Sequence, residues 1–198
     1  MLAIRGLTLA DASPCHLITT DLDHNSVLRP FSALCEHPRI KQTRVPIDPI
    51  SGLVDPNDIR KAITKDTRMI ALVHGSNVTG TLQPIREIGQ IASEHDIPFI
   101  VDAAQTCGHV PIDVEADHID FLAAPGHKGL LGPLGTGFLY IRPGMEKRLT
   151  TIREGAQARS AIWIPNLNFY PTVLSQAAIM PSASSACPPV CSGCWSRP

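Results

Sequence analysis

Short apolar segments alternate with amphipathic ones through most of this 198-residue chain, and this alternation constrains the fold more than any other feature. Apolar runs predict strands at 15–22, 41–46, 67–74, 98–103, 119–124 and 137–142. Helical spacing of apolar residues predicts helices at 26–34, 56–65 and 84–96. Strands that are apolar throughout and separated by helices favour an α/β fold, with a mostly parallel (mixed) sheet covered on both faces.

Two of these helices carry additional local signals. Asp55 followed by Pro56 is a favourable pair for the N-cap and first turn of the helix at 56–65. In the helix at 84–96, four apolar residues recur at helical spacing and predict a buried face: Ile85, Ile88, Ile91 and Ala92.

Composition bounds the class of protein. With 43% hydrophobic residues the chain can bury a core, and a formal net charge of −1 gives no reason to expect nucleic acid or a membrane surface as partner. No apolar stretch reaches the roughly 18 residues of a membrane span, and the N-terminus does not read as a signal peptide. Isolated cysteines at 15, 35 and 107 are typical of a reducing compartment and favour a cytoplasmic protein.

Polar residues gather where the predicted parallel strands end. In open α/β sheets the ligand site lies beyond the carboxyl ends of the strands. We expect six residues to converge there: His24, Asn77, Asp102, Gln105, His127 and Lys128. Each alone has an ordinary explanation, such as helix capping or solvation, so the functional signal is their joint pattern.

Lys128 points to a particular chemistry. It precedes a glycine-rich loop, 129–137, that lacks the phosphate-binding P-loop pattern, and the chain has no dinucleotide fingerprint, which excludes a nicotinamide-binding domain. A lysine amine can instead form a Schiff base with a carbonyl cofactor. If that cofactor is pyridoxal phosphate, Asp102 is suited to hold the pyridine nitrogen protonated. Gln105, one helical turn further, could bond the phenolic oxygen, and His24 could stack on the ring.

Four motifs in order, TTDLDHNSVLRP, HGSNVTGT, VDAAQTCGHVPIDV and PGHKGLLGPLGTGFLYI, resemble the class V aminotransferase family of pyridoxal-phosphate enzymes. Within it the chain is most similar to cysteine desulfurase and selenocysteine lyase-like members. The resemblance covers roughly residues 2 to 155 and implies the large cofactor-binding domain of fold type I, with an incomplete sheet of the seven-stranded type.

The resemblance also implies roles around the cofactor ring. Lys128 would form the internal aldimine and act as a catalytic residue together with His24, which would stack on the ring. Asp102 would pair with the pyridine nitrogen and Gln105 with the phenolic oxygen. The implied function is an enzyme that removes sulfur or selenium from a cysteine- or selenocysteine-like amino acid, or transfers its amino group. The family's intact members are homodimers.

Further roles follow from the same resemblance. His127 would contact the phosphate, and Asn77 would face substrate and cofactor. Many desulfurases have Ser two residues before that His, whereas this chain has Pro125. No cysteine is assigned as a sulfur acceptor, and Cys107 is interpreted as a packing residue on a helix after Asp102. The alternative hypothesis is a catalytically silent remnant or a cofactor-free binding module.

Both ends of the chain depart from the family. Relatives are much longer, and the resemblance places the first residues inside the helix that follows the family's phosphate-binding loop, so weak cofactor binding is expected. We predict two parts: 1–155, a large-domain fragment, and 156–198, a non-native tail. The tail has no Asp, Glu, Lys or His, whereas all 18 acidic residues lie before it.

Three interpretations of the tail remain open. Its Pro- and Ser-rich composition is typical of a disordered segment. Its three clustered cysteines, Cys187, Cys191 and Cys194, could form a small zinc or disulfide knot, although they supply only three metal ligands. A shifted reading frame after Gly155 explains more, because in one alternative frame three segments of the tail can encode, in order, stretches typical of the family. The nucleotide sequence of the gene tests this hypothesis.

Overall fold

The computed structural model describes residues 2–152, 163–164 and 177–179, so the boundary predicted at residue 155 lies outside the described residues. Its strands form one sheet: β1 (Cys15–Thr20), β2 (Ile40–Val45), β3 (Thr67–Val73), β4 (Phe99–Asp102), β5 (Phe121–Pro125), β6 (Gly137–Ile141), β7 (Trp163–Ile164) and β8 (Ala177–Ile179). The helices are α1 (Leu2–Thr8), α2 (Asn25–Leu34), α3 (Pro56–Ala62), α4 (Ile85–Glu94) and the 3-10 helix η1 (Met145–Arg148).

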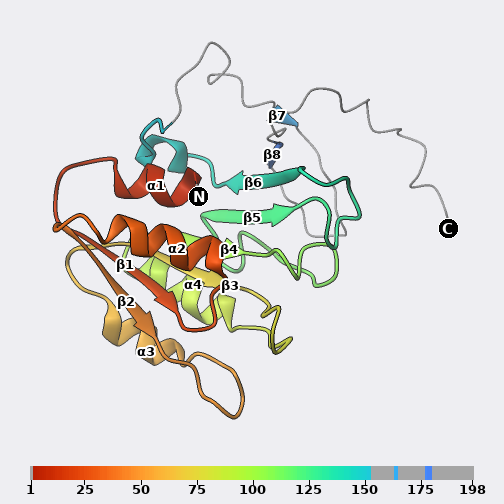
Figure 1. Ribbon diagram of the computed structural model, residues 1–198, viewed down its shortest axis with the longest axis horizontal. Helices are drawn as coiled ribbons and strands as arrows, with labels where there is room; N and C mark the ends of the chain where they lie inside the picture. Colours follow the sequence, from red (N-terminus) through yellow and green to blue (C-terminus); the bar gives the residue numbers. More distant parts are fainter. Residues whose placement is uncertain (1, 153–162, 165–176, 180–198) are drawn as a thin grey trace.

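The sheet is mixed and mostly parallel, as the sequence predicts. Its strand order is β2-β1-β3-β4-β5-β6-β8-β7 (Figure 1). The first five strands in this order pair in parallel, whereas β6 runs antiparallel to β5 and the two short strands add antiparallel pairs beyond it. The predicted fold class is confirmed, and all six predicted strands form within a few residues of their expected bounds.

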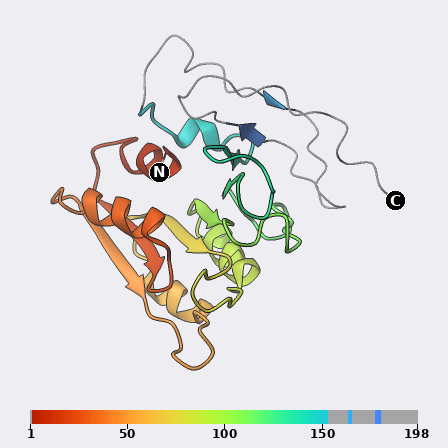
Figure 2. The ribbon, with the colours of Figure 1, turned by 45° about the vertical axis from the view of Figure 1, so that its right-hand side comes forward.

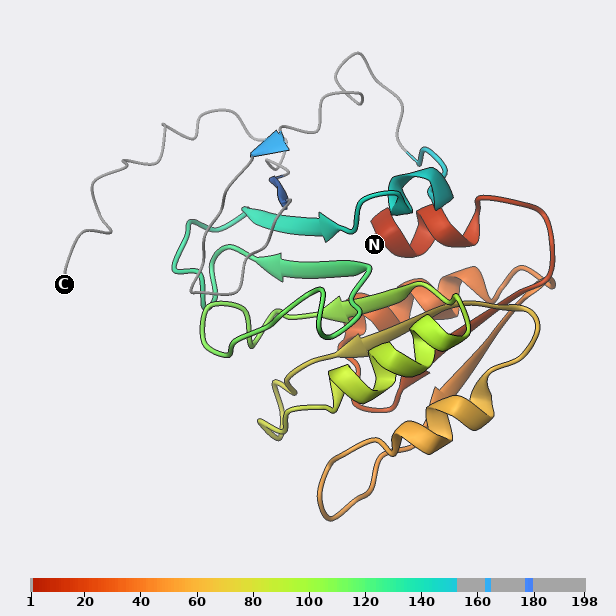
Figure 3. The same cartoon turned by 180° about the vertical axis from the view of Figure 1, so that it is seen from behind.

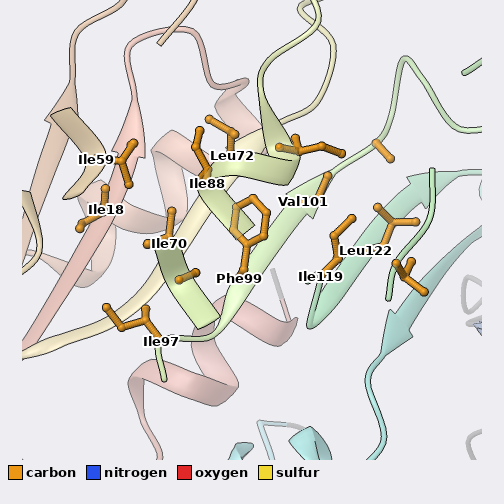
Figure 4. Packing of buried hydrophobic residues seen from close by; sticks show 14 of the residues in the cluster. Ile18, Ile59, Ile70, Leu72, Ile88, Ile97, Phe99, Val101, Ile119 and Leu122 are labelled. Carbon is orange, nitrogen blue, oxygen red and sulfur yellow. The ribbon is translucent and has the colours of Figure 1, made fainter. Parts of the chain in front are cut away.

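Helices cover both faces of the sheet. Successive residues of a strand point to opposite sides, so strands that are apolar throughout give the sheet two apolar faces that must be buried. Helices α1 and α2 lie on one face (Figure 1), and α3 and α4 lie on the other (Figure 3). On β4, Phe99 and Val101 pack in the core beneath α3 and α4, whereas Ile100 packs in the core beneath α1 and α2. Figure 4 shows the first of these cores, with Ile88 of α4 among the residues packed near Phe99.

The local helix signals are also confirmed. The Asp55 carboxylate caps α3 by accepting a hydrogen bond from the Asn57 N–H at 2.8 Å, with Pro56 in the first turn. This helix ends at Ala62, earlier than predicted, because Ile63 has an extended backbone. The predicted apolar face of α4 is buried throughout.

The first strand, β1, buries all of its residues, including a histidine. The two ring nitrogens of His16 are hydrogen-bonded to hydroxyls of the neighbouring strands, Nδ1 to Thr67 at 2.9 Å and Nε2 to Thr43 at 2.8 Å. Burial lowers the pKa of His16, because the imidazolium form loses hydration. The side chain is therefore a satisfied, neutral core residue.

The segment that begins the described chain meets the segment that follows η1. The segment after η1 lies beside α1 (Figure 2), and the Thr150 N–H donates to the Gly6 carbonyl at 3.0 Å. A side chain at Gly6 would press on the end of the Leu149 side chain, which would have to shift to admit it.

Two features differ from the sequence expectations. Hydrogen-bonded turns, and no regular helix, follow Asp102, because Gly108 takes a positive φ of 88° that ends the helical turn begun at Ala103. The strands β7 and β8, which lie within the predicted tail, were not predicted. The rest of the tail, with its three cysteines, lies outside the described residues. None of the helices among the described residues is long and apolar enough to span a membrane.

Candidate active site

The carboxyl ends of the parallel strands surround a cavity of about 600 Å³. Residues of β3, β4 and β5 line it, His24 and Ser26 enter it from the segment after β1, and the antiparallel strand β6 adds a further part of the wall. A site beyond the ends of the parallel strands is the arrangement expected of a doubly wound sheet. All six residues selected from the sequence line it: His24, Asn77, Asp102, Gln105, His127 and Lys128. The structure brings the predicted set together, and their individual roles remain predictions.

Asp102 is the last residue of β4, paired in register with Val73 of β3. Its half-buried carboxylate accepts one hydrogen bond on each oxygen, from the Ala104 N–H to Oδ1 at 2.9 Å and from the Ser26 hydroxyl to Oδ2 at 3.1 Å. A carboxylate offers about four lone-pair positions. Asp102 therefore retains the capacity to accept from a further donor in the cavity.

His24 stands at the start of α2, where it serves as the N-cap. Its Nδ1 accepts a hydrogen bond from the Ser26 N–H at 3.1 Å, a position that an Asp or Ser oxygen usually fills. The ring is exposed toward the cavity mouth. Capping thus fixes the orientation of one ring edge and leaves the rest of the imidazole available.

A buried carboxylate just before His24 holds this corner in place. Asp23 is only 5% exposed, and its Oδ1 accepts from the Val73 N–H at 2.6 Å. Its Oδ2 accepts from the Thr19 hydroxyl at 2.7 Å and from the Thr20 N–H and hydroxyl at 2.7 and 2.9 Å. Burial raises the pKa of Asp23 to about 6, and these donors oppose the rise. Asp23 thereby joins the ends of β1 and β3.

Lys128 lies on a loop, residues 126–136, that closes on itself through its backbone. The Gly126 N–H donates to the Thr136 carbonyl at 2.8 Å, and the Gly132 N–H donates to the Gly126 carbonyl at 2.7 Å. The Leu131 N–H donates to the carbonyl of Lys128 itself at 2.8 Å. These bonds hold the half-buried lysine in a defined turn after β5.

Two glycines allow the lysine loop to approach the turn that carries Gln105. A Cβ at Gly129 would collide with the Cys107 carbonyl, and one at Gly108 would collide with the Gly129 carbonyl. The backbones therefore meet without side chains between them. Gln105 lies on the first of these segments and Lys128 on the second. The two glycines therefore allow the segments that carry the Gln105 amide and the Lys128 amine to pack closely.

Two buried side chains support the turn after Asp102. His74 is 6% exposed, and its Nδ1 is hydrogen-bonded to the Thr106 hydroxyl at 2.9 Å, next to Gln105. Burial lowers the pKa of His74, which favours the neutral ring. Cys107 is 9% exposed and packs in the core, as its interpretation as a packing residue requires, and burial raises its thiol pKa to about 11.

The remaining predicted residues lie at the rim. Asn77 follows β3 in an exposed loop, and His127 is exposed directly before Lys128. Pro125, the last residue of β5, also lines the cavity. The opposite wall is apolar and includes Leu2 and Ile4 of α1. The cavity therefore has a polar end at the strand tips and an apolar side.

Sequence reasoning missed Ser26. It lines the cavity and bonds Asp102, a residue 76 positions away in the chain. The sequence did offer a signal: Ser26 is two residues after His24, a predicted site residue that caps α2. Residues in the first turn of a helix lie close to its N-cap, so Ser26 could have been added to the predicted set. Among the described residues, no group of three or more His, Cys, Asp or Glu could hold a metal ion.

Comparisons with known proteins agree with the motifs. The family described as Aminotransferase class-V matches residues 2–171. A cysteine desulfurase IscS of Dictyoglomus turgidum is 42% identical over 144 residues, which cover 72% of this chain and 36% of that protein. A cysteine desulfurase IscS of Methanosarcina thermophila is 42% identical over 158 residues, covering 79% of this chain and 38% of that protein.

Solved structures give the same result. The structure described as SspA in complex with cysteine has a TM-score of 0.73 at 36% identity and covers 79% of this chain and 45% of that one. The apo cysteine desulfurase of Thermococcus onnurineus has a TM-score of 0.72 at 33% identity, covering 87% of this chain and 42% of that one. The chain thus spans less than half the length of each of these relatives. It belongs to the class-V aminotransferase family and, within it, to the cysteine desulfurase-like subgroup.

Proposed function

We propose that this chain carries the cofactor-binding site of a pyridoxal-phosphate-dependent, cysteine desulfurase-like enzyme that acts on an amino acid through Lys128. One observation carries the proposal. The amine of Lys128 and the carboxylate of Asp102, which come from the ends of two neighbouring strands, line the same cavity together with four further polar residues. An amine and a carboxylate are the two groups that this cofactor requires of a protein at its aldehyde and its ring nitrogen.

The residues present fit the ring of the cofactor. Asp102 accepts only two hydrogen bonds within the described residues, so its ionised form has lone pairs left for a pyridinium N–H. Gln105 can donate its amide N–H to a phenolic oxygen, and His24 presents an exposed aromatic face. At the phosphate end His127 is the candidate contact, while the Thr136 hydroxyl is already donated to the Pro133 carbonyl.

The chemistry divides between cofactor and protein. When bound, pyridoxal phosphate would supply an aldehyde that condenses with an amine and a protonated ring that takes up the electron pair of a broken bond. Lys128 would hold the cofactor and then move a proton at the α-carbon of the amino acid. Asp102 would keep the proton on the ring nitrogen, and Asn77 would contact the substrate at the rim.

Cysteine, or a selenocysteine-like amino acid, is the substrate class that we propose. Two relatives are named cysteine desulfurases, and a solved relative contains cysteine, which supports this choice. Cys107 does not suit the role of sulfur acceptor, since its thiol is buried and its pKa is raised to about 11, so little thiolate forms. We further propose a homodimer and a cytoplasmic location, as the resemblance and the isolated cysteines suggest.

A cofactor-binding experiment tests the proposal. The purified chain is mixed with pyridoxal phosphate, and the visible absorbance of the protein-bound cofactor is recorded before and after dialysis. We expect Lys128→Ala to abolish the retained absorbance and Lys147→Ala, which removes an exposed amine of η1, to preserve it. Equal absorbance in both variants, or none in the unsubstituted chain, would overturn the proposal and favour a silent remnant or a cofactor-free binding module.

The reaction itself needs a second measurement. With cysteine as substrate, a desulfurase passes sulfur at the zero oxidation level to an acceptor thiol as a persulfide and leaves alanine, and an added thiol such as dithiothreitol then reduces that sulfur to sulfide. A transaminase instead converts the cofactor to its amine form. Sulfide and alanine are therefore assayed together under reducing conditions. Accumulation of the amine form of the cofactor without alanine would contradict the desulfurase assignment and favour amino transfer as the reaction.

A further inference from the structure

Ser26 occupies a position between two residues of the proposed site. It lies in the first turn of α2, with its Oγ 3.1 Å from Asp102 Oδ2 and 3.0 Å from His24 Nδ1. The side chain is exposed to the cavity and is not buried in the core. A serine hydroxyl placed here therefore contacts the site, and two possible acceptors lie within reach of its single proton.

The hydrogen-bond network decides where that proton goes. The Ser26 backbone N–H donates to His24 Nδ1 at 3.1 Å, which occupies the one lone pair of that nitrogen. Nδ1 then carries no proton, and the neutral ring has its proton on Nε2, as assigned from this network. An ionised carboxylate can only accept. The hydroxyl proton of Ser26 consequently goes to Asp102.

This bond completes a two-point attachment of the Asp102 carboxylate. Oδ1 is held by the Ala104 N–H, which belongs to the turn following β4, and Oδ2 is held by Ser26, which belongs to α2. With a donor on each oxygen, the carboxylate cannot rotate about its terminal bond without breaking one of them. The plane of the carboxylate is therefore set by two separate elements of the fold.

We propose that Ser26 is a positioning residue that orients Asp102 toward the ring nitrogen of the cofactor. This inference rests on the proposed function, in which Asp102 pairs with a protonated pyridine. A charged hydrogen bond depends on alignment, and its strength falls steeply as the angle at the proton closes. A carboxylate held by Ala104 alone would visit rotated positions, so the ring would be bound less tightly.

The effect of removing the Ser26 hydroxyl on cofactor binding can be separated from any effect on the stability of α2. Alanine has a higher helix propensity than serine, so Ser26→Ala should not weaken α2 itself. The backbone N–H that donates to His24 is also unchanged by this substitution. Loss of cofactor affinity in Ser26→Ala would therefore report the hydroxyl. Ser32 is an exposed serine of the same helix and provides the matched control.

Equilibrium dialysis with pyridoxal phosphate measures the effect. An exposed hydrogen bond to a charged group that acts through orientation transmits only part of the stabilisation of a fully formed one. We expect Ser26→Ala to raise the dissociation constant about 3- to 10-fold. Ser26→Thr, which keeps the hydroxyl, should restore it to near the original value, and Ser32→Ala should leave it unchanged. Far-UV circular dichroism checks that each variant is folded.

A cofactor analogue makes the test specific for the ring nitrogen. In the analogue that has carbon in place of that nitrogen, Asp102 has no pyridinium to bind. Ser26→Ala should then have no effect on the dissociation constant of the analogue. The same loss for both ligands would overturn the inference, because a general structural role of Ser26 does not distinguish them.

The outcomes separate the two proposals. If the unsubstituted chain binds pyridoxal phosphate through Lys128 and Ser26→Ala binds it equally well, only the inference about Ser26 fails. If the unsubstituted chain binds no cofactor, the proposed function fails and the inference fails with it. A loss in Ser26→Ala that Ser26→Thr does not restore would also count against the hydroxyl.

Discussion

The buried carboxyl of Asp23 should make the stability of this protein depend on pH in a way that one substitution removes. Burial raises the pKa of Asp23 from 3.8 to about 6. Between these values the folded chain keeps a proton that the unfolded chain has lost. Stability from this group is therefore present below about pH 4 and is lost as the pH rises through about 6.

The structure sets the magnitude. Raising the pKa of one carboxyl from 3.8 to about 6 changes the free energy of unfolding by about 3 kcal/mol in full, of which about 2 kcal/mol falls between about pH 4 and about pH 7. Asparagine has nearly the same shape and does not titrate. Because Thr20 and Val73 each direct a backbone N–H at one Asp23 oxygen, an amide must set its NH₂ against one of them. At about pH 4 this should cost about 1–3 kcal/mol.

Urea denaturation followed by circular dichroism measures the effect. We expect Asp23→Asn to be less stable than the unsubstituted chain at about pH 4, and the difference between them to fall by about 2 kcal/mol on going to about pH 7. Asp21→Asn is the control, because Asp21 is exposed and paired with Arg44 at 3.2 Å. An equal pH dependence in the Asp23→Asn and unsubstituted chains would refute the reasoning.

Three other predictions follow from buried groups. Gly89→Ala would set a Cβ against the Asp117 carbonyl and should destabilise the fold by about 3 kcal/mol, near the upper end for overpacking, whereas the exposed control Gln90→Ala should leave the melting temperature nearly unchanged. Since burial raises the thiol pKa of Cys107 to about 11, iodoacetamide should modify it far more slowly in the folded chain than in urea, as measured by mass spectrometry; equal rates would contradict its burial. Burial lowers the pKa of His16 from 6.5, so its stabilising contribution is present above 6.5 and should be lost as the pH falls from there toward the lower folded value. His16→Gln should reduce the loss of melting temperature below pH 6.5; an unchanged slope would argue against a buried neutral ring.

Much of the fold was predictable because it follows from local periodicity. Apolar strands such as 67–74 and the helical face of Ile85, Ile88 and Ile91 report which side chains leave water, and the structure buries them as expected. Asp55 caps its helix by a bond to a residue two positions away, so the signal lies within one turn. The helix assumed after Asp102, on which Gln105 and Cys107 were placed, did not form, because the positive φ of Gly108 ends the helical turn begun at Ala103.

The candidate site divides in the same way. The alternation of strands and helices, and polar residues at strand ends, were enough for the sequence to determine that Asp102 and Lys128 would meet at one edge of a parallel sheet. Only the tertiary structure decided that Ser26 bonds Asp102, that Asp23 bonds Val73, and that the backbones near Gly108 and Gly129 touch. The physical reason is that periodicity records which face of an element is buried, whereas a hydrogen bond between distant segments depends on how those faces pack in three dimensions.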